Sequence, residues 1–130
     1  MWSRLSILGM LVMAGCTTPT VEQRPIDQTR QRLIAMGQAY AQTLAKGKMP
    51  SKLADLQPAL KSLGDPDELS TSPRDGQPFV ILWGTRFTEP EARVYMHEQT
   101  GKSGSRFVLL TDGSSFEVSD ERFQTMPKVK

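Results

Sequence analysis

The chain has 130 residues, with 16 Lys and Arg against 14 Asp and Glu, for a formal net charge of +2. This length is close to that of one compact domain. No nucleic-acid partner is expected, because nucleic-acid-binding proteins concentrate their basic residues in one patch, whereas here basic residues alternate with acids and amides. The single cysteine cannot form a disulfide within the chain, so the fold must depend on its hydrophobic core.

The N-terminal residues have the composition of an export signal. Arg4 provides one positive charge, and residues 5–14 form an apolar run of 10 residues. Such a run is too short for a transmembrane helix, which needs about 20 apolar residues, but it is typical of a secretory signal peptide that ends in small residues. Ala14 and Gly15 are those small residues, and Cys16 follows them. We predict a signal peptide over residues 1–15.

Residues 12–16, Val-Met-Ala-Gly-Cys, resemble the lipobox of bacterial lipoproteins. The resemblance implies that a diacylglyceryl group is attached to the sulfur of Cys16, that the leader is cut just before it, and that the new amino terminus is acylated too. Two acyl chains suffice for stable anchoring. Residues 16–24 are then the lipidated cysteine and a polar tether. The implied partner is a lipid bilayer, on the periplasmic or cell-surface side of the bacterial cell membrane or outer membrane.

A long amphipathic helix is predicted over residues 25–46. Its apolar stripe follows the 3.6-residue period and is formed by Ile26, Leu33, Met36, Tyr40 and Leu44. Gly37 lies on or beside this stripe. It lowers helix propensity but permits a close approach of whatever packs there.

A second, short helix is predicted after the first. Ser51 is its expected N-cap, and Leu53 and Leu56 are expected to point inward. Pro58 is expected to end or restart this helix. Residues 65–77 show no period and are rich in turn residues and acids, which predicts a loop.

Four strands are predicted in the second half of the chain. Residues 78–84 form a continuous apolar run, typical of a strand covered on both faces. Residues 92–98 alternate, which predicts a half-buried strand. One face is expected to carry Ala92, Val94 and Met96. The other face is expected to carry Arg93, Tyr95 and His97. Residues 106–111 and 115–119 are the last two strands. The short connections require antiparallel neighbours, because a parallel crossover needs a dozen or more residues.

Helices followed by a meander predict an α+β fold, in which a long N-terminal amphipathic helix packs on a four-stranded antiparallel sheet and residues 25–130 form a single domain. Residues 47–56 and 75–80 resemble segments of the head domains of type II secretion pseudopilins and type IV pilin-like proteins. The hairpin at 107–114 resembles the end of many such domains. The resemblance implies a pilin-head-like fold and an envelope or secretion-system protein as partner. A lipobox and polar tether replace the membrane-embedded helix of pilins.

The sequence shows no recognised catalytic constellation, and we do not expect an enzyme. His97 is the only histidine, and hence the only usual neutral-pH general base. A Ser-His-Asp site would need it beside Ser103 or Ser115 and beside Asp112. Cross-strand packing of His97 is the favoured interpretation.

Four acids in one loop form a candidate metal site: Asp65, Asp67, Glu68 and Asp75. Hard cations such as Ca²⁺ prefer several oxygen ligands, and calcium occurs in some pseudopilin heads. The run lacks the glycine and the spacing of an EF-hand, so a solvated acidic loop is the favoured alternative. No cofactor is expected.

Trp83, Tyr95 and His97 are candidates for an exposed binding face, because aromatic side chains anchor partners when they are exposed. The favoured alternative is that Trp83 closes the core at the end of its strand. The expected function is that of a membrane-anchored envelope lipoprotein acting as a non-enzymatic structural or protein-interaction module. The alternative is an envelope lipoprotein that binds a small ligand or calcium.

Overall fold

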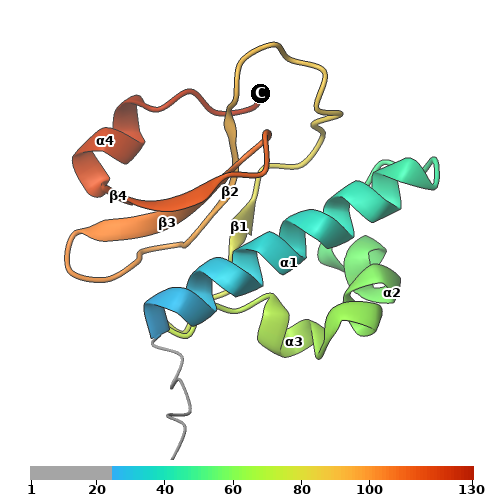
Figure 1. Ribbon diagram of the computed structural model, residues 1–130, viewed down its shortest axis with the longest axis horizontal. Helices are drawn as coiled ribbons and strands as arrows, with labels where there is room; N and C mark the ends of the chain where they lie inside the picture. The colour runs from blue at the N-terminus through green and yellow to red at the C-terminus, as the bar shows by residue number, and fades with distance from the viewer. Residues whose placement is uncertain (1–24) are drawn as a thin grey trace, which may run out of the picture.

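The structure, a computed structural model, describes residues 25–130 (Figure 1). The predicted signal peptide over residues 1–15, Cys16 and the predicted tether lie outside the described residues. Among the helices that are described, none combines the length and the apolar character needed to cross a membrane.

In the described part of the chain, three helices precede four strands and a short helix follows them. The helices are α1 (Pro25–Ala45), α2 (Leu53–Leu63), α3 (Pro66–Leu69) and, at the end, α4 (Asp120–Thr125). The strands are β1 (Val80–Ile81), β2 (Val94–His97), β3 (Ser105–Leu110) and β4 (Ser115–Ser119). They form one antiparallel sheet in the order β1-β2-β3-β4 (Figure 1). The α+β class and the four-stranded antiparallel meander are therefore confirmed.

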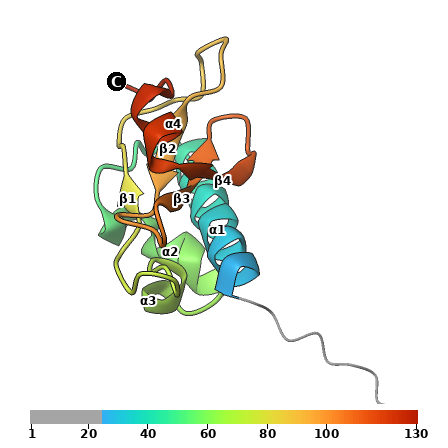
Figure 2. The same cartoon turned by 90° about the vertical axis from the view of Figure 1, so that its left-hand side faces the viewer.

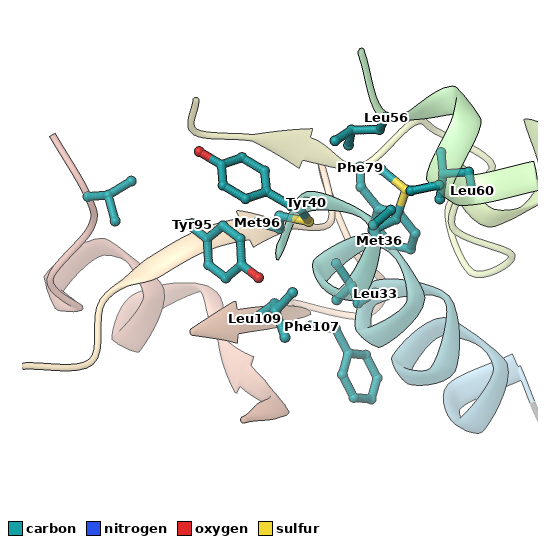
Figure 3. Packing of buried hydrophobic residues seen from close by; sticks show 13 residues of the cluster. Leu33, Met36, Tyr40, Leu56, Leu60, Phe79, Tyr95, Met96, Phe107 and Leu109 are labelled. Carbon is teal, nitrogen blue, oxygen red and sulfur yellow. The ribbon is translucent and has the colours of Figure 1, made fainter. Parts of the chain in front are cut away.

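Helices cover both faces of the sheet. α1 lies against one face with α2 and α3 packed along it, and α4 lies against the other (Figures 1 and 2). The larger core cluster fills the space between α1, α2 and the sheet, and it includes Leu33, Met36, Tyr40, Leu56, Leu60, Tyr95, Met96, Phe107 and Leu109 (Figure 3). The smaller cluster, under α4, contains Val94, Val108, Val118 and Phe123.

Gly37 lets α1 approach the strands closely. A Cβ atom at this position would lie 2.7 Å from Cδ2 of Leu109 and 2.8 Å from the hydroxyl oxygen of Tyr95. Side chains of Leu33, Met36 and Tyr40 on the same stripe are fully buried. The close approach predicted from the position of the glycine is therefore present in the fold.

A β-bulge in β2 overturns the predicted alternation. The register with β3 shifts between Val94 and Met96, so Tyr95 is an extra residue in this strand. Tyr95 and Met96 both enter the core under α1, whereas Val94 and His97 face α4. The prediction that Tyr95 shares a face with His97 is wrong. The prediction that this strand is half-buried is also wrong, because all four residues of β2 are buried between helices.

The second helix differs from its prediction at both ends. Lys52 is the N-cap residue, without a side-chain capping bond. Ser51 instead donates to Oδ2 of Asp55 from its backbone N–H (3.0 Å) and its hydroxyl (3.3 Å). Pro58 lies inside the helix, because buried apolar residues on both sides of it outweigh the one lost backbone bond. Leu53 is 37% exposed, so only the second of the two leucines expected inside is buried.

Two other predicted segments have different lengths in the structure. The predicted loop over residues 65–77 contains the one-turn helix α3. The predicted strand over 78–84 is reduced to β1, which is half-buried. The chain beyond β1 is held to α1 by the hydroxyl of Tyr40, which accepts from Gly84 N (3.2 Å) and donates to Thr85 O (2.9 Å). These bonds hold Gly84 and Thr85 beside α1.

Candidate functional site

The four acids of the predicted metal site do not converge. Asp67 and Glu68 lie on α3 and Asp65 precedes it, while the Asp75 carboxylate is directed to the β2–β3 connection. Glu68 pairs with Arg32, with Oε1 3.5 Å from Nη2. Within residues 25–130, no three Asp, Glu, His or Cys side chains are grouped so that they could hold a metal ion.

Asp75 fastens its loop to the β2–β3 connection. Its Oδ2 accepts from the backbone N–H of Thr100 (3.1 Å) and of Gly101 (3.0 Å), and its Oδ1 accepts from Gln77 N (2.9 Å). Partial burial raises the pKa of Asp75, but these hydrogen bonds from Gln77, Thr100 and Gly101 outweigh burial and hold the pKa below its usual value. The carboxylate thus has a structural role.

Arg74 is the centre of a buried ionic cluster that the sequence pattern does not predict. Its side chain is 5% exposed and its Nη2 lies 3.3 Å from Oε1 of Glu98, which is fully buried. Its Nη1 donates to Oε2 of Glu117 at 2.6 Å. Glu98 also accepts from the Ser72 hydroxyl (2.6 Å) and from Phe107 N (2.8 Å). The cluster joins the loop before β1 to the residue after β2, to β3 and to β4.

The β3–β4 pair completes this cluster. Arg74 Nη2 donates to Ser105 O at 3.0 Å, and the Ser105 hydroxyl donates to Glu117 Oε2 at 2.5 Å. The Ser105 hydroxyl and the Arg74 guanidinium hold the pKa of Glu117 below its usual value. One signal could have revealed Glu98 in the sequence, because it lies two residues after Met96 and so places an acid on an apolar face.

The three residues of the predicted binding face lie on opposite sides of the sheet. Trp83 stacks on Tyr40 with ring centroids 6.1 Å apart, and Tyr95 meets Tyr40 edge-on at 5.4 Å. His97 faces α4 and packs against Phe123 at 4.6 Å. Tyr95 and His97 are both buried. The structure therefore does not combine the three side chains into one exposed face.

His97 is engaged in packing and a short-range hydrogen bond. Its Nδ1 lies 2.7 Å from the carbonyl oxygen of Glu98, so a neutral ring with the proton on Nδ1 donates to this carbonyl. Burial lowers the pKa of His97 despite this bond, and the charges of Arg106 and Lys128 lower it further. The folded protein therefore favours the neutral imidazole.

The structure does not assemble the Ser-His-Asp group considered from the sequence. Ser115 pairs with Leu109, whose side chain enters the core under α1, while His97 faces α4. The Asp112 carboxylate accepts from the backbone N–H (2.9 Å) and the hydroxyl (2.5 Å) of Ser114. Asp112 thus shapes the β3–β4 turn.

Lowering the pH from about 7.5 to about 5.5 is expected to reduce the free energy of unfolding. The unfolded chain protonates its histidine with a pKa of about 6.5, whereas the folded protein resists protonation of His97, because its pKa is lowered. The contribution of neutral His97 to the free energy of unfolding is present above about pH 6.5. It is lost as the pH falls below this value, by at most about 1.4 kcal/mol per pH unit. Urea denaturation at a series of pH values measures it.

The matched control is His97→Gln, which does not titrate and should give a nearly flat profile in this window. The carboxylates of Asp75 and Glu117 have lowered pKa values in the folded state. Their contributions are lost only as the pH falls through about 4.5 and below, outside the window. A profile for His97→Gln as steep as that of the unaltered protein would contradict the assignment.

A groove of about 370 Å³ lies between α1 and the β3–β4 turn. Its lining includes Ile34, Gly37, Phe87, Tyr95 and Leu109, together with the exposed Asp112. We call it the α1–hairpin groove. It lies on the α1 side of the sheet.

The described residues thus present two candidate places: the buried Arg74 cluster, whose carboxylates are bonded within the protein, and the α1–hairpin groove, which is open. Comparison with protein-family models, with curated proteins and with solved structures finds no match to this chain.

Proposed function

We propose that this chain is an exported bacterial lipoprotein, held on a bilayer by acylated Cys16, and that residues 25–130 act as a non-enzymatic structural or protein-interaction module of the cell envelope. The observation that carries the proposal is the lipobox-like Val-Met-Ala-Gly-Cys over residues 12–16, directly after a 10-residue apolar run. Two acyl chains at Cys16 would keep the protein on the membrane without a spanning helix.

The finer fold assignment, a pilin-head-like domain with a long N-terminal helix on the sheet, belongs to the same proposal. The order of elements supports it, because α1 is followed by α2 and then by the meander β1 to β4. α1 begins directly after the predicted tether, so the anchor would hold the domain by the start of this helix. An envelope or secretion-system protein is the proposed partner.

The non-enzymatic role is supported by the way in which the reactive side chains are used. His97 packs against Phe123 and bonds a backbone carbonyl. Glu98 is bonded to Arg74 and Ser72, and the Asp75 carboxylate holds the β2–β3 connection. These contacts use the side chains to hold the fold together, and a firmly held domain suits a module that binds or positions another protein.

Cys16→Ser is expected to abolish incorporation of labelled palmitate and to release the protein from the membrane fraction, because serine has no thiol for diacylglyceryl transfer. Intact-mass measurement of the unaltered protein should show a chain that begins at Cys16 and carries acyl chains. Thr17→Ser is the matched control and should remain in the membrane. The anchor is refuted if Cys16→Ser stays in the membrane fraction as before, or if the mass includes the leader.

The interaction role is tested by crosslinking intact cells and capturing the protein, with Cys16→Ser as the control that has the same domain without the anchor. The unaltered protein should be crosslinked to an envelope protein in amounts that the control does not reach. Capture of no envelope protein, combined with turnover of a small substrate that His97→Gln abolishes, would contradict a non-enzymatic module.

A further inference from the structure

The α1–hairpin groove has the size and composition of a small-molecule site. Its volume of about 370 Å³ falls in the lower part of the range for such sites. Most of the lining is apolar, from Ile34 on α1, Phe87 on the β1–β2 connection and Leu109 on β3. Three separate segments therefore form its walls.

The hydroxyl of a largely buried tyrosine opens into this groove. Tyr95 is 3% exposed, and its hydroxyl forms no hydrogen bond with any residue in the described range 25–130. Tyr40, in contact with the Tyr95 ring, is different, because its hydroxyl bonds Thr85 O and Gly84 N. The Tyr95 hydroxyl is not among the fully enclosed polar atoms that lack a partner, so it reaches the open groove. An acceptor atom of a ligand in the groove would take the place of solvent at this hydroxyl.

Gly37 sets the floor of the groove beside this hydroxyl. The Tyr95 hydroxyl is directed toward α1 (Figure 3) and would lie 2.8 Å from a Cβ at position 37. Any side chain at Gly37 would occupy this space and displace the hydroxyl. The glycine and the bulge in β2, which turns Tyr95 toward α1, together place this hydroxyl beside the apolar side chains of Phe87 and Leu109.

Two ionisable side chains in the lining, Tyr95 and Asp112, define the ligand further. Burial and the neighbouring Tyr40 raise the pKa of Tyr95, so the hydroxyl stays protonated and can donate. The hydroxyl and the backbone N–H of Ser114 lower the pKa of Asp112, so this residue in the lining is a carboxylate at neutral pH. A negative ligand would be repelled by it, and an uncharged one would not.

We propose that the α1–hairpin groove binds a small uncharged molecule with a ring-sized apolar body and one carbonyl or ether oxygen, which accepts a hydrogen bond from the Tyr95 hydroxyl. The apolar body lies against Phe87 and Leu109, where ring–ring contact and burial of apolar surface favour it. This site does not depend on the anchor at Cys16, so the two proposals fail independently.

Three naphthalene probes test the proposal on the ¹⁵N-labelled full chain carrying Cys16→Ser, in which no acyl chain competes for the groove. The probes are 2-acetylnaphthalene, 2-ethylnaphthalene, which lacks the acceptor, and 2-naphthoate, which is an anion. Saturable shifts of the backbone amides of Gly37, Thr111 and Gly113 are expected with the ketone. The ketone should bind roughly fivefold more tightly than the hydrocarbon, as one hydrogen bond allows, and the anion should bind more weakly than the ketone.

Matched tyrosine variants identify the donor. Tyr95→Phe should remove the preference for the ketone over the hydrocarbon while the variant stays folded, because the hydroxyl it loses has no bond in the protein. Tyr40→Phe loses a bonded hydroxyl outside the groove and should keep the preference. Asp112→Asn should bring the affinity for 2-naphthoate closer to that for the ketone.

The proposal is overturned if the ketone gives no saturable shifts at the groove amides up to its solubility limit, or if the shifts cluster elsewhere on the protein. It is also overturned if Tyr95→Phe keeps the full preference for the ketone. Because all three probes share the naphthalene body, binding through apolar contact alone would appear as equal affinities for ketone and hydrocarbon, which contradicts the assigned role of Tyr95.

Discussion

Replacing Arg74 with Met is expected to lower the free energy of unfolding by about 3–5 kcal/mol, the usual effect of leaving a buried charge without its partner. The Glu98 carboxylate is fully buried and lies 3.3 Å from the Arg74 guanidinium. After the substitution, the Ser72 hydroxyl and Phe107 N remain as its donors among residues 25–130. A loss of this size is a large fraction of the roughly 5–15 kcal/mol that stabilises a typical domain.

Chemical denaturation of Arg74→Met measures this loss, and Arg106→Met is the matched control. Arg106 pairs with Asp120, whose side chain is 45% exposed, so water can replace the lost partner and a loss of about 1 kcal/mol is expected. The double variant Arg74→Met/Glu98→Gln should recover part of the stability, because the buried charge is then absent. Equal losses in Arg74→Met and Arg106→Met would contradict a special role for the buried pair.

Gly101→Ala is expected to destabilise the protein by about 2–5 kcal/mol, from backbone strain and steric overlap combined. Gly101 has a φ of +70°, and its Cβ would overlap the carbonyl oxygen of Ser105 and lie 2.8 Å from the Cα of Arg106. These atoms belong to the backbone and cannot rotate away. The β2–β3 connection would have to open, which would also strain the bond from Gly101 N to Asp75.

Gly104→Ala separates the two causes. Gly104 has a φ of +79° in the same connection, but no atom lies within 4 Å of its Cβ position. The strain of a left-handed residue remains, at about 1–2 kcal/mol, and the overlap is absent. Thermal and urea unfolding of both variants should therefore place Gly101→Ala clearly below Gly104→Ala. Equal stabilities would mean that the overlap at position 101 relaxes at no cost.

The local sequence predicts some features of the candidate sites and does not predict others. The sequence shows that several acids lie near Asp75, but the bonds of the Asp75 carboxylate depend on Thr100 and Gly101, far along the chain. The open groove depends on the inward turn of Tyr95, which a strictly alternating strand does not predict. A one-residue bulge reverses the face of every residue beyond it, and the pattern of apolar residues in this short strand did not reveal the bulge.

The sequence by itself determined the features that depend on neighbours a few residues away. Its helical period predicted the buried side chains of Leu33, Met36 and Tyr40. Its short connections required the antiparallel order of the strands. Local geometry suffices for these features, because helix period and turn length act within a few residues.

Only the tertiary structure decided which side of the sheet each residue of β2 faces, that α2 continues through Pro58, and that Arg74 and Glu98 form a buried pair. Each of these outcomes balances a local cost against packing by distant segments. The bulge loses regular pairing, the proline loses a backbone bond and the ion pair loses hydration. Because the compensating contacts come from residues far apart in the chain, the local sequence pattern does not reveal them.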